Sequence, residues 1–219
     1  MLNVTARLEL MSKILDTLKA VVEDAKFEFK ENSLHIRVVD PSHVAMIQMD
    51  IDSAAFDTWE LDETEIAFEI DMVRDLVGLG SEDEMLNLRA DEGSGMLQAS
   101  LGNVEGEFRT IDPSTITARA LPPLDPKCKV HLSGPDFIRI LSAAALGGDL
   151  VTFGIGDDHF KVSANNTNNN IQVDFHKDNL QLFEFDKASH SQYSLSYLQP
   201  LKKVVGRVET LEIGFGENY

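Results

Sequence analysis

Residues able to bind a metal ion or act as nucleophiles are mostly isolated from one another in this chain. Asp157, Asp158 and His159 are the exception, because adjacent carboxylate and imidazole groups are ligands for a divalent cation. They also separate two apolar segments, where aspartate favours a tight turn for backbone reasons alone. The pattern therefore predicts a hairpin turn, and a metal-dependent enzyme using this acidic turn is the alternative interpretation.

Signatures of catalysis do not occur in the sequence. HExxH, CxxC, GxxxxGK[ST] and GxSxG motifs are all missing. The single cysteine, Cys128, has no evident base beside it that would activate the thiol. We therefore predict a protein that is not an enzyme and that uses no metal or cofactor.

Basic side chains occur on the four helices that the apolar periodicity predicts. The first two helices span residues 10–22 and 71–79, the third begins at the cap-like segment 133–136, and the fourth contains Pro200. Their basic residues are Lys13, Lys19, Arg74, Arg139, Lys202 and Lys203. If all four helices face one way, they form a basic lining that contacts phosphates without reading base sequence.

The overall charge limits how nucleic acid can be bound. The chain has 37 acidic and 19 basic residues, which gives a formal net charge of −18. Such an acidic surface argues against indiscriminate DNA binding, which requires a basic footprint. A segregated basic surface on an acidic exterior remains compatible with this composition.

Strands are predicted between the helices from alternating apolar residues. The predicted strands span residues 25–30, 34–39, 44–51, 65–70, 85–90, 96–101, 104–110, 127–133, 150–155 and 159–164. Gly102 and Asn103 form a two-residue hairpin turn, because glycine supplies the positive φ that such turns need. Hairpins combined with amphipathic helices predict an α+β fold.

The second half of the chain repeats the first. Ile14-Leu15 corresponds to Ile140-Leu141 at an offset of 126, and Leu86 corresponds to Leu211 at 125. We therefore predict two similar domains, residues 1–110 and 127–219, joined by a connector over 111–126 that contains four of the seven prolines. Strands over 96–110 have no counterpart before the last residue, so the second domain is expected to lack its C-terminal strands and to be less stable.

Membrane insertion and secretion are not predicted. No apolar segment approaches the ~18 residues of a membrane-spanning helix. The N-terminus also lacks the basic start and apolar block of a signal peptide. We expect an intracellular protein without a membrane partner.

Residues 40–59 carry a family resemblance. The segments DPSHVAMIQM (40–49) and AFDTW (55–59) resemble a signature of sliding clamps of the proliferating cell nuclear antigen (PCNA) type, and the sequence looks archaeal. The resemblance implies a homotrimeric ring, with antiparallel sheets outside and two helices per domain lining the channel. Such a ring encircles duplex DNA on the chromosome, in the cytoplasm of archaea or the nucleus of eukaryotes. It tethers DNA polymerase, flap endonuclease and DNA ligase after a clamp loader closes it. A checkpoint-type subunit of a hetero-oligomeric ring is a further alternative.

The resemblance also implies sites. The six basic helix residues match DNA-facing positions or their neighbours, whereas Ser12 and Ser142 stand where relatives can have a basic residue. The implied subunit interface pairs Val104, Glu105, Gly106, Glu107, Phe108, Arg109 and Thr110 with Asn170, Ile171, Gln172, Val173, Asp174, Phe175, His176 and Lys177 of the next subunit. The implied client pocket comprises Val39, His43, Val44, Leu121, Pro122 and Ser194.

Two departures from the family pattern produce further expectations. Pro200 is expected to distort the fourth helix, because proline removes a backbone donor. The missing C-terminal strands are expected to expose the strand edge at residues 44–51 and to weaken the binding of client peptides. Titration with a labelled client peptide tests this, since micromolar or tighter affinity would contradict it.

Overall fold

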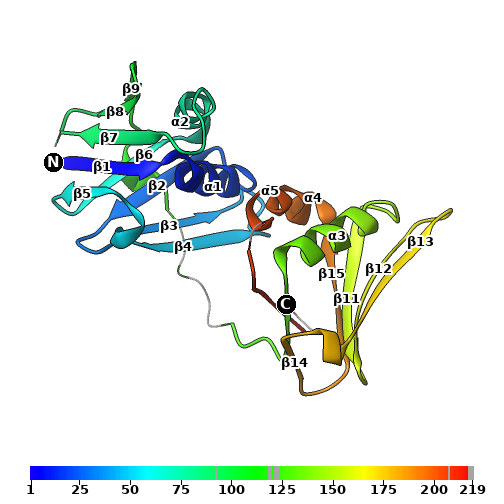
Figure 1. Cartoon of the computed structure of the whole chain (residues 1–219). Helices are drawn as coiled ribbons and strands as arrows, with labels where there is room; N and C mark the ends of the chain where they lie inside the picture. The colour runs from blue at the N-terminus through cyan, green and yellow to red at the C-terminus, as the bar shows by residue number, and fades with distance from the viewer. Residues whose placement is uncertain (92, 118–119, 121–123, 207, 217–219) are drawn as a thin grey trace. The chain divides into compact units, whose positions relative to one another are not determined.

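The computed structural model describes the chain except for residues 92, 118–119, 121–123, 207 and 217–219. The chain divides into two compact units, residues 1–121 and 122–219 (Figure 1). Each unit has its own cluster of buried apolar residues. The division falls within residues 111–126, which the prolines marked as a connector.

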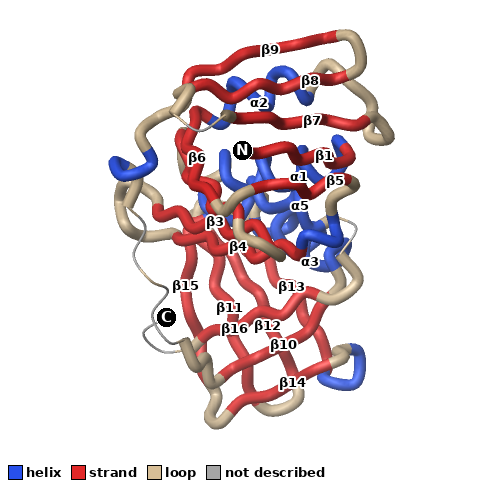
Figure 2. Tube along the Cα trace, turned by 90° about the vertical axis from the view of Figure 1, so that its left-hand side faces the viewer, coloured by secondary structure: helices blue, strands red, loops and turns tan. Residues whose placement is uncertain are grey.

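Unit 1 is built from nine strands and two helices in the part of the chain that is described. Its elements are β1 (Leu2–Arg7), α1 (Leu8–Lys19), β2 (Asp24–Phe29), β3 (Ser33–Val39), β4 (Met46–Asp52), β5 (Thr58–Leu61), β6 (Thr64–Glu69), α2 (Ile70–Val77), β7 (Met85–Ala90), β8 (Met96–Leu101) and β9 (Val104–Arg109). They form two antiparallel sheets, ordered β5-β1-β7-β8-β9 and β4-β3-β2-β6. Figure 2 shows β9, β8, β7, β1 and β5 of the first sheet in this order. Strands β9 and β4 are therefore outer strands of their sheets.

The core of unit 1 lies where both helices meet the sheets. Apolar residues at helical spacing give α1 one buried face, and Leu15 and Leu18 are fully buried there. The rings of Phe27 and Phe68 stack at 4.5 Å between their centroids, joining β2 to β6. The polar faces of the helices therefore carry the charged residues.

Unit 2 repeats this arrangement. Its elements are β10 (Cys128–Leu132), α3 (Gly134–Ala144), β11 (Leu150–Gly156), β12 (His159–Asn165), β13 (Asn170–His176), β14 (Leu182–Phe185), β15 (Ser189–Ser194), α4 (Leu195–Leu198), α5 (Lys202–Val205) and β16 (Leu211–Phe215). The sheets are ordered β14-β10-β16 and β13-β12-β11-β15. Among the described residues, β8 and β9 have no counterpart in unit 2, so its first sheet has three strands where unit 1 has five.

Several element boundaries differ from the sequence expectations. The first helix begins at Leu8 rather than at residue 10, because β1 leads directly into it without a loop. Strands β1, β5, β14 and β15 were not predicted, since each is short or continues directly into a helix or turn. Strand β13 was expected only from the family resemblance, and β16 only from the repeat. No helix in the described part of the chain is long and apolar enough to span a membrane.

The fourth helix is interrupted, as the proline predicted. A 3-10 turn over Gln199–Leu201 separates α4 from α5. Pro200 lies in this turn and has no backbone N–H to donate. The segment therefore tightens locally while its backbone stays right-handed helical.

Candidate nucleic-acid interface and protein-contact edges

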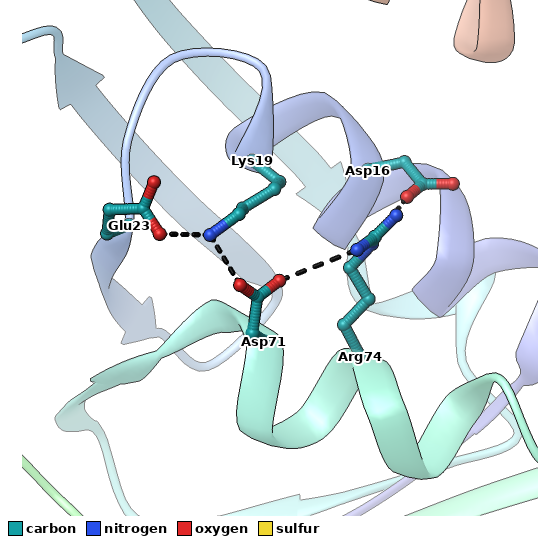
Figure 3. Close-up of polar contacts among 5 residues, drawn as sticks. All are labelled: Asp16, Lys19, Glu23, Asp71 and Arg74. Carbon is teal, nitrogen blue, oxygen red and sulfur yellow. Dashed lines mark hydrogen bonds and ion pairs between the residues drawn. The ribbon is translucent and has the colours of Figure 1, made fainter.

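The basic side chains of unit 1 lie in a network of ion pairs between α1 and α2 (Figure 3). Lys19 Nζ lies 2.5 Å from a carboxylate oxygen of Asp71 and also pairs with Glu23. Arg74 Nε donates to Asp16 Oδ1 at 2.7 Å, and its Nη1 lies 3.5 Å from Asp71 Oδ1. Asp71 therefore links the basic residues of the two helices.

The electrostatics of this network favour the charged forms. Hydrogen bonds to Asp71 and Glu23 raise the pKa of the Lys19 amine above its ordinary value. The same contact with Lys19 lowers the pKa of the Asp71 carboxyl. The hydrogen bond to Asp16 raises the pKa of the Arg74 guanidinium. The third basic residue of these helices, Lys13, pairs with Glu9 at 2.8 Å one turn earlier on α1.

Unit 2 places its basic helix residues differently. Arg139 on α3 and Lys203 on α5 are exposed, and Lys202 is half-buried. None of the three has an ion-pair or hydrogen-bond partner among the described residues. Helix α3 contacts the turn between α4 and α5, where Gln199 Nε2 donates a hydrogen bond to the Leu141 carbonyl at 2.8 Å. Unit 2 thus has, on neighbouring helices, three cations that are unpaired as far as the described residues show.

Strand β9, expected at the subunit interface, is the outer strand of its sheet. It follows β8 through the two-residue turn at Gly102-Asn103, with Leu101 opposite Val104. Hydrogen-bonded pairs alternate along an antiparallel ladder, so the backbone N–H groups of Glu105 and Glu107 point away from β8. Thr110 N–H donates to the Gly95 carbonyl at 3.0 Å, which continues the same alternation.

Strand β13, the expected partner of β9, is also an outer strand of its sheet. Ile171, Val173 and Phe175 are half-buried, and the latter two pack against the core of unit 2. On the other face, Asp174 pairs with His159 of β12 at 2.5 Å. The remaining members of the expected interface are exposed, except for His176, Gly106, Phe108 and Thr110, which are half-buried.

The loop after β3 is organised by one buried carboxylate. Asp40 is 4% exposed and accepts hydrogen bonds from the backbone N–H groups of Ser42, Val44 and Ala45, at 2.9, 2.7 and 2.6 Å. His43 adopts a φ of 57°, which asparagine or glycine would adopt more easily. The loop thereby presents the Val44 side chain, which is 69% exposed.

The residues of the expected client pocket are only partly described. Val39, His43 and Val44 lie together at the end of β3 and in the following loop. Leu121 and Pro122 lie outside the described residues. Ser194 belongs to unit 2, where its hydroxyl accepts a hydrogen bond from the Ser196 N–H and caps α4. The structure therefore brings together three of these six residues.

The acidic turn is a hairpin turn between β11 and β12. Asp157 has a φ of 50°, and Asp158 pairs with Lys177 at 2.6 Å. The described residues contain no group of three or more histidine, cysteine or carboxylate residues placed to hold a metal ion. The turn geometry and the pairing with Lys177 are the roles that the structure gives to the two aspartates.

Sequence reasoning missed the residues that set the properties of these surfaces. Asp16 and Asp71 neutralise Lys19 and Arg74, and Asp40 shapes the loop that contains His43 and Val44. Three of the ion pairs have a local signal in the sequence, because Lys13–Glu9 and Lys19–Glu23 are four residues apart and Asp71–Arg74 are three apart. The contact of Lys19 with Asp71 spans two helices, so no local spacing identifies it.

Comparison with known proteins identifies one family, through a model that matches unit 1 and relatives that match nearly the whole chain. Residues 2–108 match the family model described as "Proliferating cell nuclear antigen, N-terminal domain". The DNA polymerase sliding clamp of Methanosarcina mazei is 28% identical over 212 residues, covering 96% of this chain and 86% of the relative. That of Haloarcula marismortui is 28% identical over 223 residues and covers 100% of this chain and 90% of the relative.

Solved structures agree in fold. The structure described as "C-terminal region of FEN-1 bound to A. fulgidus PCNA" is 28% identical, with a TM-score of 0.93, and covers 100% of this chain and 89% of that one. PCNA from Thermococcus kodakaraensis has a TM-score of 0.89 at 19% identity, over 99% of this chain and 90% of that one, and shows the fold alone.

Proposed function

Because the chain belongs to the family of DNA polymerase sliding clamps of the PCNA type, we propose that it closes into a homotrimeric ring around duplex DNA. The observation that carries this proposal is the agreement in fold over the whole chain with a clamp of that type. A closed ring holds DNA topologically, so each phosphate contact can be weak and the ring can slide. The chain would therefore act without catalysis, by tethering enzymes to the chromosome and raising their effective concentration.

The six basic residues on the helices are our proposed DNA contacts. Their side chains are long and cationic, which suits contacts to phosphates that carry no sequence information. Contact of this kind is independent of base sequence, which is what a sliding protein requires.

The subunit interface that we propose is an antiparallel pairing of β9 with β13 of the next chain. Two outer strands can extend one sheet across a boundary through main-chain hydrogen bonds. In β9, Glu105 and Glu107 direct backbone donors toward that partner.

The docking surface that we propose for client enzymes includes the exposed loop at His43 and Val44. The A. fulgidus structure bound to a FEN-1 segment supports flap endonuclease as one client class, alongside DNA polymerase. Ligase and clamp-loader binding are proposed from family membership alone. Titration of a labelled C-terminal flap endonuclease peptide measures this docking.

The experiment that tests the ring is solution mass by light scattering, at low and high salt. A trimer would have a mass of about 73 kDa, three times the chain mass of 24.3 kDa. Glu107→Pro removes one outward donor of β9 and leaves the ladder with β8 intact, because proline is tolerated on an outer strand. We expect the Glu107→Pro variant to be monomeric with unchanged circular dichroism.

The matched control is Glu107→Ala, which removes the same carboxylate but keeps the N–H and should remain trimeric. A trimeric Glu107→Pro variant would contradict the proposed pairing. A monomeric unmodified chain would contradict the homotrimer and favour a ring built with other chains.

A further inference from the structure

The helices of unit 1 hold their basic side chains in internal ion pairs. Helices α1 and α2, with Glu23 just beyond α1, carry five acidic and three basic residues: Glu9, Asp16, Glu23, Asp71 and Asp75 against Lys13, Lys19 and Arg74. Each basic group lies within 2.8 Å of a carboxylate oxygen. This face is therefore net negative, although it contains three of the six proposed DNA contacts.

The helices of unit 2 have the opposite balance. Residues 134–144 and 195–205 carry one acidic residue, Asp136, and three basic residues. The Asp136 carboxylate accepts a hydrogen bond from the Ser133 hydroxyl at 2.6 Å, and Ser133 caps α3 by accepting the Asp136 N–H. Arg139, Lys202 and Lys203 have no partner in the described part of unit 2, and this face is net positive.

We infer that the phosphates of DNA are held by the α3 and α5 cations of unit 2, and that the α1–α2 surface of unit 1 is a neutralised face that contributes little affinity. The inference rests on the proposed function, because it states which of the six proposed DNA contacts provide the affinity. A phosphate that approaches Lys19 or Arg74 meets Asp71 or Asp16 at the same place. Binding must then displace a carboxylate or accept repulsion from it.

The ion pairs of unit 1 also affect how DNA affinity should depend on salt concentration. DNA affinity depends on salt because each cation that neutralises a phosphate releases a counterion. A cation already neutralised by a carboxylate releases none. The slope of log affinity against log salt concentration should therefore depend on the basic residues of unit 2 and change little when those of unit 1 are removed.

The experiment compares two double variants of the full chain that each remove two positive charges. One is Lys202→Gln with Lys203→Gln, and the other is Lys19→Gln with Arg74→Gln. Affinity for a fluorescein-labelled blunt duplex is measured by anisotropy at several salt concentrations. Thermal melting by circular dichroism checks folding, and Lys19→Gln alone replaces the second variant if that variant unfolds.

We expect the unit 2 variant to lose about tenfold in affinity and its salt slope to fall by about 2, one for each phosphate contact. The unit 1 variant removes no phosphate contact, so it should keep the salt slope of the unmodified chain. Its affinity should fall by less than about threefold, through repulsion from the Asp16 and Asp71 carboxylates that it leaves unpaired. Asp16→Asn with Asp71→Asn should strengthen binding, because it frees two cations.

Equal losses in the two double variants, or no gain from the Asp16→Asn and Asp71→Asn pair, would overturn the inference while leaving the proposed DNA contact in place. If the unmodified chain shows no salt-dependent binding to duplex DNA, the proposed DNA contact fails, and the inference fails with it.

Discussion

At the residue scale, the buried carboxylate of Asp40 decides the shape of the loop that presents Val44. Three backbone donors point at its two oxygens within five residues of sequence. A carboxylate that satisfies several N–H groups at once replaces the backbone partners that an irregular loop lacks. The aspartate of the family signature therefore acts as a positioning residue, while the valine beside it forms the exposed surface.

Replacing this aspartate should cost stability and docking together. We expect Asp40→Ala to lower the free energy of unfolding by about 1.5–3 kcal/mol, the range for hydrogen bonds to a charged group. Urea unfolding measures this change, and binding of the labelled client peptide should weaken in parallel. Asp57→Ala is the matched control, because Asp57 is exposed with no side-chain hydrogen bond among the described residues, and we expect a change within about 0.5 kcal/mol. Equal losses in both variants would show that the carboxylate does not hold the loop.

At the element scale, the start of α3 depends on close approach of two helices. Gly134 is the first residue of α3, and its N–H donates to the Val208 carbonyl at 2.8 Å. A Cβ at this position would lie 1.8 Å from the Val205 carbonyl oxygen at the end of α5. Glycine is needed here for space, and the helix that carries Arg139 is placed by this contact.

A methyl group at this site should therefore destabilise unit 2. We expect Gly134→Ala to lower the free energy of unfolding by at least about 1–3 kcal/mol, the usual cost of overpacking. Gly78→Ala is the control at the end of α2, where φ is −65° and a Cβ has no described contact closer than 3.5 Å. The control should be neutral or stabilising by up to about 1 kcal/mol. Similar denaturation midpoints for the two variants would contradict the close approach.

At the scale of the whole molecule, the two units have cores of different size. The buried cluster of unit 1 contains twenty-six of the described residues, and that of unit 2 contains sixteen. Apolar burial is the main stabilising term in folding, so the smaller core predicts the less stable unit.

The chain contains a natural probe for each unit. Its single tryptophan, Trp59, lies in unit 1, and its single cysteine, Cys128, is fully buried in unit 2. As denaturant concentration rises, we expect the Cys128 thiol to become reactive toward a thiol reagent before Trp59 fluorescence changes. Coincident transitions would mean that the two units unfold as one cooperative body.

The repeated organisation, most of the elements and the family could be predicted from the amino-acid sequence. Apolar periodicity is a local property, so the helices containing Leu15 and Leu141 and the strands containing Phe27 and Phe153 were predictable from spacing alone. Gly102-Asn103 and Pro200 acted locally in the same way, by fixing a turn and interrupting a helix. Short strands such as β5 could not be predicted, because four residues are too few to show an apolar alternation.

Which basic side chains are free to contact phosphates depends on the folded arrangement of the helices. Lys19 and Arg74 looked equivalent to Arg139 and Lys203 in sequence, since each is a basic residue on an amphipathic helix. Their difference arises from contacts between α1 and α2, which bring Asp16 and Asp71 from 58 and 52 residues away in sequence to the basic groups. Electrostatic pairing depends on distance in space, and amino-acid spacing within one helix does not contain that distance.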